Sequence, residues 1–98
     1  MSLQVTFHRA AGAEFIEASA WYEAKRVGLA LEFITEIDRC VSLASKKPLQ
    51  FAVVREEIRR VVALSFPYSV YFRAEENRVV VLAVFHGSRD PAIWQARA

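Results

Sequence analysis

Residues 78–86 read R-V-V-V-L-A-V-F-H, and this stretch decides the fold. Its apolar run, Val79 to Phe85, is too short to span the roughly 30 Å hydrocarbon core of a bilayer. Because the run is apolar on both alternating faces, it is typical of an inner β-strand that is covered on one side and sparingly exposed on the other. We therefore expect residues 78–86 to anchor the hydrophobic core.

Two segments upstream alternate with a period of two, which indicates antiparallel strands. In residues 58–66 the more apolar row contains a single charge, Arg60, and Pro67 ends the segment. The apolar members of that row are Ile58, Val62, Leu64 and Phe66. A second strand is expected over residues 68–73, with Tyr68, Val70 and Phe72 on one side.

Two amphipathic helices are predicted before these strands, because apolar residues recur there at three- and four-residue spacing. The first helix runs from Ala10 to about Lys25, and Gly28 breaks it because glycine adopts the left-handed conformation that ends helices. The second helix follows at once and stops before Pro48. Its apolar stripe is Ala30, Phe33, Ile34, Ile37, Cys40, Val41 and Ala44. The two helices are expected to form a hairpin.

The two ends of the chain complete the expected fold. Residues 3–8 alternate as a short strand, and Asp90 followed by Pro91 is a helix-start signal before a short terminal helix. The predicted class is α+β, of order β-α-α-β-β-β, in which the helical hairpin packs on one face of a small, mostly antiparallel sheet. Residues 1–98 are expected to form a single domain.

Composition narrows the class of protein. At 54% hydrophobic and 24% charged residues the chain is expected to be globular. The single cysteine, Cys40, falls on a helical apolar stripe, and the N-terminus has no export signal, so we expect a reducing, cytoplasmic compartment. The net charge is only +2, but residues 49–98 hold seven arginines and no lysine, which makes this half the better place to look for an anionic partner.

Several motifs in this order resemble those of a known family. They are Phe15 to Trp21-Tyr22-Glu23, Gly28-Leu29, Phe33, Ile37, Pro48, Phe66-Pro67-Tyr68-Ser69-Val70-Tyr71-Phe72, His86-Gly87-Ser88-Arg89-Asp90-Pro91 and Trp94. Together they resemble the RelE/ParE toxins of bacterial type II toxin–antitoxin (plasmid stabilisation) modules, and the order of elements is also the family's. The resemblance implies growth inhibition, no cofactor, and a cognate antitoxin protein that forms a hetero-oligomer with the toxin.

The family implies one of two mechanisms. RelE-like members are similar to ribonucleases that cleave mRNA on the ribosome, whereas ParE-like members inhibit DNA gyrase without chemistry of their own. RNA cleavage needs a proton-transfer group and cations around the phosphorane. The candidates are His86 for the proton, Arg60, Arg73 and Arg89 for the phosphate, and Tyr68 or Tyr71 for base stacking.

One departure from the ribonuclease pattern favours the ParE-like side. RelE-like enzymes resemble one another in carrying a basic residue shortly before the tyrosine of the third strand, but residues 63–67 before Tyr68 are uncharged. The residues therefore favour a non-enzymatic inhibitor. A RelE-like endoribonuclease and a non-toxic binding module of the same fold stay open as alternatives.

Two residues of the first helix are expected to contact the antitoxin. Trp21 falls off the helix's apolar stripe, and an exposed large aromatic residue often marks an interface, so we expect Ile16 and Trp21 to be covered by the antitoxin's C-terminal segment. The open alternative is that Trp21 packs near Trp94 under the terminal helix. No metal site is expected, since His8 and His86 are far apart in sequence and no ligand cluster accompanies them.

Overall fold

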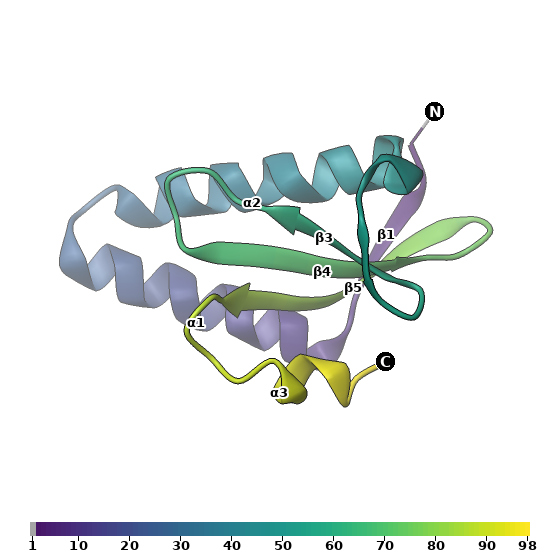
Figure 1. Cartoon of the computed structure of the whole chain (residues 1–98). Coiled ribbons are helices and arrows are strands. Elements are labelled where there is room, and N and C mark those ends of the chain that lie inside the picture. The colour runs from purple at the N-terminus through teal and green to yellow at the C-terminus, as the bar shows by residue number, and fades with distance from the viewer. Residues whose placement is uncertain (1) are drawn as a thin grey trace.

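The nine-residue strand β5 (Arg78–His86) lies inside a five-stranded sheet of order β1-β5-β4-β3-β2 (Figure 1). The computed structural model describes residues 2–98. Strand β1 (Gln4–Phe7) runs parallel to β5, whereas β4 (Tyr68–Ala74), β3 (Ile58–Val62) and β2 (Val53–Arg55) are antiparallel to their neighbours. The mostly antiparallel sheet confirms the predicted α+β fold.

The helical hairpin covers one face of this sheet, as predicted (Figure 1). It consists of α1 (Arg9–Lys25) and α2 (Leu29–Lys46), and a short 3₁₀ helix, η1 (Pro48–Gln50), follows. Gly28 takes a left-handed φ of 90° between the two helices. The N-terminal end of α2 has no side-chain cap from its own N-cap residue, Gly28. Instead, Glu23 of α1 accepts hydrogen bonds from the backbone N–H groups of Gly28 and Ala30. The hairpin turn is therefore fixed by one glycine and one carboxylate.

An aromatic cluster fills the space between the hairpin and the sheet. Phe33 of α2 is fully buried, and its ring lies 5.0 Å from those of Tyr22 and Tyr68 and 5.3 Å from that of Phe66. Burial of such rings stabilises the fold, and the edge-on geometry of the Phe33 pairs with Phe66 and Tyr68 adds about 0.5–1.5 kcal/mol per pair. Cys40 is also fully buried on this face, as expected for a small apolar residue, and burial raises the pKa of its thiol to about 11.

Strand β5 is buried on both faces, which corrects the expectation of a sparingly exposed side. Its second face packs against Trp94 of the terminal helix α3 (Ala92–Gln95), and Trp94 stacks on Tyr71 with ring centroids 4.2 Å apart. A bulge opposite Tyr71/Phe72 places the consecutive residues Leu82 and Ala83 in this second cluster. The predicted helix start is confirmed, because Asp90 accepts a hydrogen bond from the backbone of Ala92.

The region around β3 differs from the prediction in two ways. The strand is shorter than residues 58–66. The buried residues of that segment are Ile58, Val61 and Ala63, whereas Val62 and Leu64 of the more apolar row are exposed. The reason is that the hairpin covers the row containing Val61, while α3 covers the opposite face only near β5. Strand β2 was not predicted. Among the described residues, no helix is both long and apolar enough to cross a membrane.

Candidate functional site

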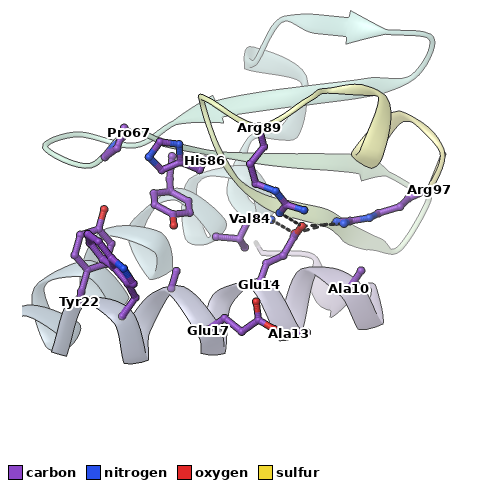
Figure 2. A pocket seen from close by; sticks show the side chains of 13 residues that line it. Ala10, Ala13, Glu14, Glu17, Tyr22, Pro67, Val84, His86, Arg89 and Arg97 are labelled. Atoms are coloured by element: carbon purple, nitrogen blue, oxygen red, sulfur yellow. Dashed lines mark hydrogen bonds and ion pairs between the residues drawn. The ribbon is translucent and has the colours of Figure 1, made fainter. Parts of the chain in front are cut away.

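A groove of about 640 Å³ lies between α1 and the C-terminal half of β5 (Figure 2). Its walls come from α1, from the loop before β4, and from β5 with the segment that follows it. The lining residues are Ala10, Ala13, Glu14, Glu17, Ala18, Trp21, Tyr22, Pro67, Tyr68, Val84, His86, Arg89 and Arg97. Small side chains on α1 keep the floor of the groove open.

The groove exists because β1 ends before β5 does. Strand β1 pairs with β5 only from Arg78 to Val81, and His8 closes the ladder by donating its N–H to the Val81 carbonyl at 2.8 Å. Beyond Val81, β5 has β4 as a strand neighbour on one side and α1 on the other. Exposed backbone groups at a strand edge must find other partners.

Two side chains supply those partners at one end of the groove. Glu14 accepts a hydrogen bond from the backbone N–H of Val84 at 3.1 Å, and Arg97 donates to the Leu82 carbonyl at 3.0 Å. Arg97 also donates to both carboxylate oxygens of Glu14, at 2.9 and 2.8 Å. Figure 2 shows Glu14 reaching from α1 toward the arginines. The pair therefore occupies the position that a further strand would take along β5.

Arg89 completes this charge cluster, which we call the Glu14 cluster (Glu14, Arg89 and Arg97). Its guanidinium donates to Glu14 at 2.8 Å and lies 4.4 Å from the centroid of the Phe85 ring. The Arg97 and Glu14 side chains are only 12% and 11% exposed, whereas Arg89 is 41% exposed. The cluster ties the segment after β5 to the first helix.

Aromatic residues form the other end of the groove. Trp21 is 57% exposed, contacts the Tyr22 ring edge-on at 5.1 Å, and carries Lys25 Nζ 4.7 Å from its ring centroid. The Tyr68 ring meets His86 edge-on at 5.1 Å, and burial raises the pKa of the Tyr68 hydroxyl. Trp21 therefore offers a large apolar surface beside a half-buried tyrosine.

His86 is held in place by the turn that follows β5. Its Nδ1 accepts a hydrogen bond from the backbone N–H of Ser88 at 3.0 Å, and the Ser88 hydroxyl lies 2.8 Å from the same atom. The ring is half-buried against Tyr68. This is the hydrogen bond to the following turn that a strand-end histidine commonly makes, and it engages one of the two ring nitrogens.

The loop that carries Pro67 and Tyr68 is fixed from the second helix. Glu36 of α2 accepts a hydrogen bond from the backbone N–H of Leu64 at 2.6 Å and two from Arg39 at 2.8 and 2.7 Å. The Arg39 hydrogen bonds, helped by Leu64, lower the pKa of the Glu36 carboxyl to about 2. The next residue, Ser65, takes a positive φ of 66°. Glu36 thereby positions the wall of the groove.

The predicted ribonuclease candidates are divided between two hollows. Tyr68 and His86 line the groove together with Arg89, whereas Arg60, Tyr71, His86 and Arg89 line a smaller cavity of about 290 Å³. Arg73 lines neither hollow and pairs with Glu75 at 3.1 Å. Among the described residues, no three His, Cys, Asp or Glu side chains gather where they would hold a metal ion.

The two expected antitoxin contacts lie on α1. Trp21 lines the groove, whereas Ile16 is 72% exposed and lies outside its lining. The alternative placement of Trp21 beside Trp94 is wrong, because Trp94 stacks on Tyr71 in the cluster on the opposite sheet face. Sequence reasoning missed Glu14, Glu36 and Arg97. Their partners are 75, 28 and 83 residues distant, and no local pattern marks such pairs.

The fold and groove define a small α+β domain in which a helical hairpin leaves one end of a sheet edge open. A family model described as "ParE toxin of type II toxin-antitoxin system, parDE" matches residues 5–91. The chain therefore belongs to the ParE toxin family of type II toxin–antitoxin systems, as the sequence motifs predicted.

A solved structure supports the fold independently. The structure described as "Chromosomal ParDE TA system from P. aeruginosa" matches with a TM-score of 0.75 and 18% sequence identity, over 87% of this chain and 96% of that chain. At that identity the likeness shows the shared fold. No curated protein sequence matches the chain.

Proposed function

We propose that this toxin arrests growth by inhibiting DNA gyrase, without a reaction of its own, and that a cognate antitoxin silences it by covering the α1 groove. The choice of mechanism rests on the ion pairs that the candidate arginines already form with carboxylates of the chain. Arg89 is bound to Glu14 and Arg73 to Glu75, so among the described residues only Arg60 of the three has no carboxylate partner.

A ribonuclease has stricter requirements. It must stabilise a phosphorane with additional negative charge, and loss of one such contact costs about 3 kcal/mol, or roughly a hundredfold in rate. Here Nδ1 of His86 is engaged by Ser88, and in the cavity that His86 shares with Arg60, Tyr71 and Arg89, Arg89 is already paired with Glu14. An inhibitor needs only shape and hydrogen bonds from these residues, so the geometry supports the gyrase mechanism better.

The groove supports the antitoxin part of the proposal. Its walls combine the exposed Trp21 ring with Tyr22, Tyr68 and small α1 side chains, and Ile16 is a second exposed apolar residue of α1, outside the groove lining. Exposed aromatic residues beside a hollow are common anchors of protein interfaces. The Glu14 cluster occupies the edge of β5 at the far end. We therefore place the antitoxin's C-terminal segment over Trp21 and Ile16.

The mechanism is tested by inducing the toxin and measuring early incorporation of labelled thymidine against labelled amino acid. We expect thymidine incorporation to stop first, purified toxin to inhibit gyrase supercoiling, and His86→Gln to leave toxicity largely intact. The chain is a RelE-like ribonuclease if amino-acid incorporation collapses first, mRNA cuts map within codons, and His86→Gln abolishes both the collapse and the cuts. If neither DNA synthesis nor protein synthesis stops, the chain is a non-toxic binding module.

The antitoxin site is tested with the product of a neighbouring reading frame for a small acidic protein. Trp21→Ala should weaken the complex by about 2 kcal/mol, or roughly thirtyfold, since interface tryptophans often carry such energies. Leu49→Ala is the matched control, because Leu49 is 73% exposed and lies outside the groove. Equal affinity of both variants in calorimetry contradicts the proposed site, and failure of the partner to relieve toxicity contradicts the antitoxin role.

A further inference from the structure

A second hollow lies on the sheet face opposite the helical hairpin. This cavity of about 290 Å³ is bounded by Arg60 of β3, Tyr71 of β4, Phe85 of β5, and by Arg89 and Trp94 of the C-terminal segment. Three aromatic rings form its walls, with Tyr71 stacked on Trp94 at 4.2 Å and edge-on to Phe85 at 6.3 Å. We call it the Arg60 cavity.

The charged side chains that line the Arg60 cavity, Arg60 and Arg89, are both positive. None of the residues that line it is acidic. Arg89 shares the single carboxylate of Glu14 with Arg97, and the neighbouring acid Asp90 accepts a hydrogen bond from the backbone N–H of Ala92. Among residues 2–98, Arg60 has no carboxylate within ion-pair distance, although its side chain is exposed. The cavity therefore presents one arginine free to bind an anion.

A second, independent feature also calls for an acceptor. The indole N–H of Trp94 is buried and has no hydrogen-bond partner among the described residues, and Trp94 as a whole is only 3% exposed. Buried donors are almost always satisfied in folded proteins, so an unsatisfied one calls for a missing partner. Trp94 lines the same cavity as Arg60. The nitrogen itself is closed to solvent, so a group that enters the cavity would reach it after a small shift of the Trp94 ring.

We propose that the Arg60 cavity binds the carboxylate of an acidic side chain on a partner protein, which pairs with the Arg60 guanidinium and accepts the Trp94 indole N–H. An arginine guanidinium fits a carboxylate with two parallel hydrogen bonds. The aromatic walls receive the methylene groups of that acidic side chain and an apolar neighbour. Arg60 and Trp94 lie outside the lining of the α1 groove, although His86 and Arg89 line both hollows, and the test of this proposal does not depend on gyrase or on the antitoxin.

A protein carboxylate fits better than a nucleic-acid backbone. Binding a polyanion requires several cations along its path. The six arginines that form ion pairs share four carboxylates, Glu14, Glu32, Glu36 and Glu75. Of the two arginines that line this cavity of about 290 Å³, only Arg60 has no carboxylate partner among the described residues, which matches a single anionic group.

The two tryptophans provide a direct test, because Trp21 lies in the α1 groove and Trp94 in the Arg60 cavity. The full chain, labelled with ¹⁵N by cell-free synthesis, shows one indole N–H resonance for each. It is titrated with a blocked leucine-glutamate-leucine peptide and with its glutamine counterpart. We expect the Trp94 resonance to move downfield with the glutamate peptide, the Trp21 resonance to stay, and the glutamine peptide to bind about tenfold more weakly.

Two variants make the assignment specific. Arg60→Gln should weaken the glutamate peptide about fivefold, as for loss of one accessible ion pair, whereas Arg55→Gln should change affinity less than about twofold. Arg55 is the matched control because it is exposed on the neighbouring strand β2 and lies outside the cavity lining. Equal effects of both variants, equal binding of both peptides, or a Trp94 shift with single-stranded RNA but not with the glutamate peptide would each overturn the proposal.

Discussion

The two helices of the hairpin each hold one glutamate against the sheet, and the two differ in where their arginines come from. Glu14 of α1 binds the Val84 N–H at 3.1 Å, and its arginines, Arg89 and Arg97, follow 75 and 83 residues later. Glu36 of α2 binds the Leu64 N–H at 2.6 Å, and its arginine is on its own helix, three residues on.

The difference separates local from long-range stabilisation. A pair three residues apart on a helix forms wherever that helix forms, and it is worth about 0.2–0.5 kcal/mol in an isolated helix. The Glu14 cluster forms only when α1, β5 and the C-terminal segment are all in place. We therefore expect Glu14 to matter more for the whole fold, and Glu36 mainly for the loop beside the groove.

The largest effect is expected from Glu14→Gln. The variant leaves Arg97, whose side chain is 12% exposed, without its carboxylate, and removing one partner of a nearly buried pair costs about 3 kcal/mol. Urea unfolding measured by circular dichroism gives the free energy of unfolding. Glu17→Gln is the control, because Glu17 is exposed on the same helix, lines the same groove, and has no ion pair among the described residues. A loss no larger than that of the control would remove the long-range role of Glu14.

These glutamates also mark the limit of what the sequence predicts. The helices and β5 were predictable, because periodicity and run length are local properties that packing preserves. Strand β2 was not, since it is three residues long and fully exposed, and its turn uses Glu56 at a φ of 51° without a turn-marking glycine. The bulge in β5 was also unpredictable, because Leu82 and Ala83 are both apolar.

The candidate site was predicted only in part. Trp21, Tyr68, His86 and Arg89 were singled out, and all line the groove. Their ion pairs and hydrogen bonds depend on which distant segments meet, and a single sequence does not contain that information. Arg73 illustrates the point. An arginine is a suitable residue for a phosphate contact, but the turn after β4 pairs Arg73 with Glu75 instead.

A smaller effect, with a defined pH dependence, is expected from Glu36→Gln. Hydrogen bonds to a charged group contribute about 1.5–3 kcal/mol, and we expect a loss near the lower value at pH 7. The folded pKa of Glu36 is lowered from 4.5 to about 2, so its contribution is fully present above pH 4.5 and is lost as the pH falls toward 2. The difference in unfolding free energy between wild type and variant should shrink over that range.

The control for this pH series is Asp38→Asn, because Asp38 is exposed on the same helix and makes no ion pair among the described residues. It should show no comparable convergence with wild type at low pH. Convergence of both variants to the same extent would mean that acid acts through overall charge. A constant difference for Glu36→Gln across the range would contradict a lowered pKa at this position.

The smallest effect is expected from Glu75→Gln, although this carboxylate also binds two arginines. The Arg78 and Arg73 hydrogen bonds lower the pKa of Glu75, with contacts of 2.6 and 3.1 Å. The Glu75 side chain, however, is 31% exposed at the β4–β5 turn, against 13% for Glu36, and among the described residues it accepts no hydrogen bond from a backbone N–H. Water screens such surface pairs, so the urea midpoint should stay within experimental error of wild type, and added salt should leave that result unchanged. Because Glu75 binds arginines but no backbone N–H group, this measurement separates the effect of arginine pairing from the effect of the backbone hydrogen bonds that Glu14 and Glu36 accept. If Glu75→Gln destabilises as strongly as Glu36→Gln, arginine pairing alone accounts for both effects, and the hydrogen bond between Glu36 and the Leu64 backbone contributes nothing distinctive.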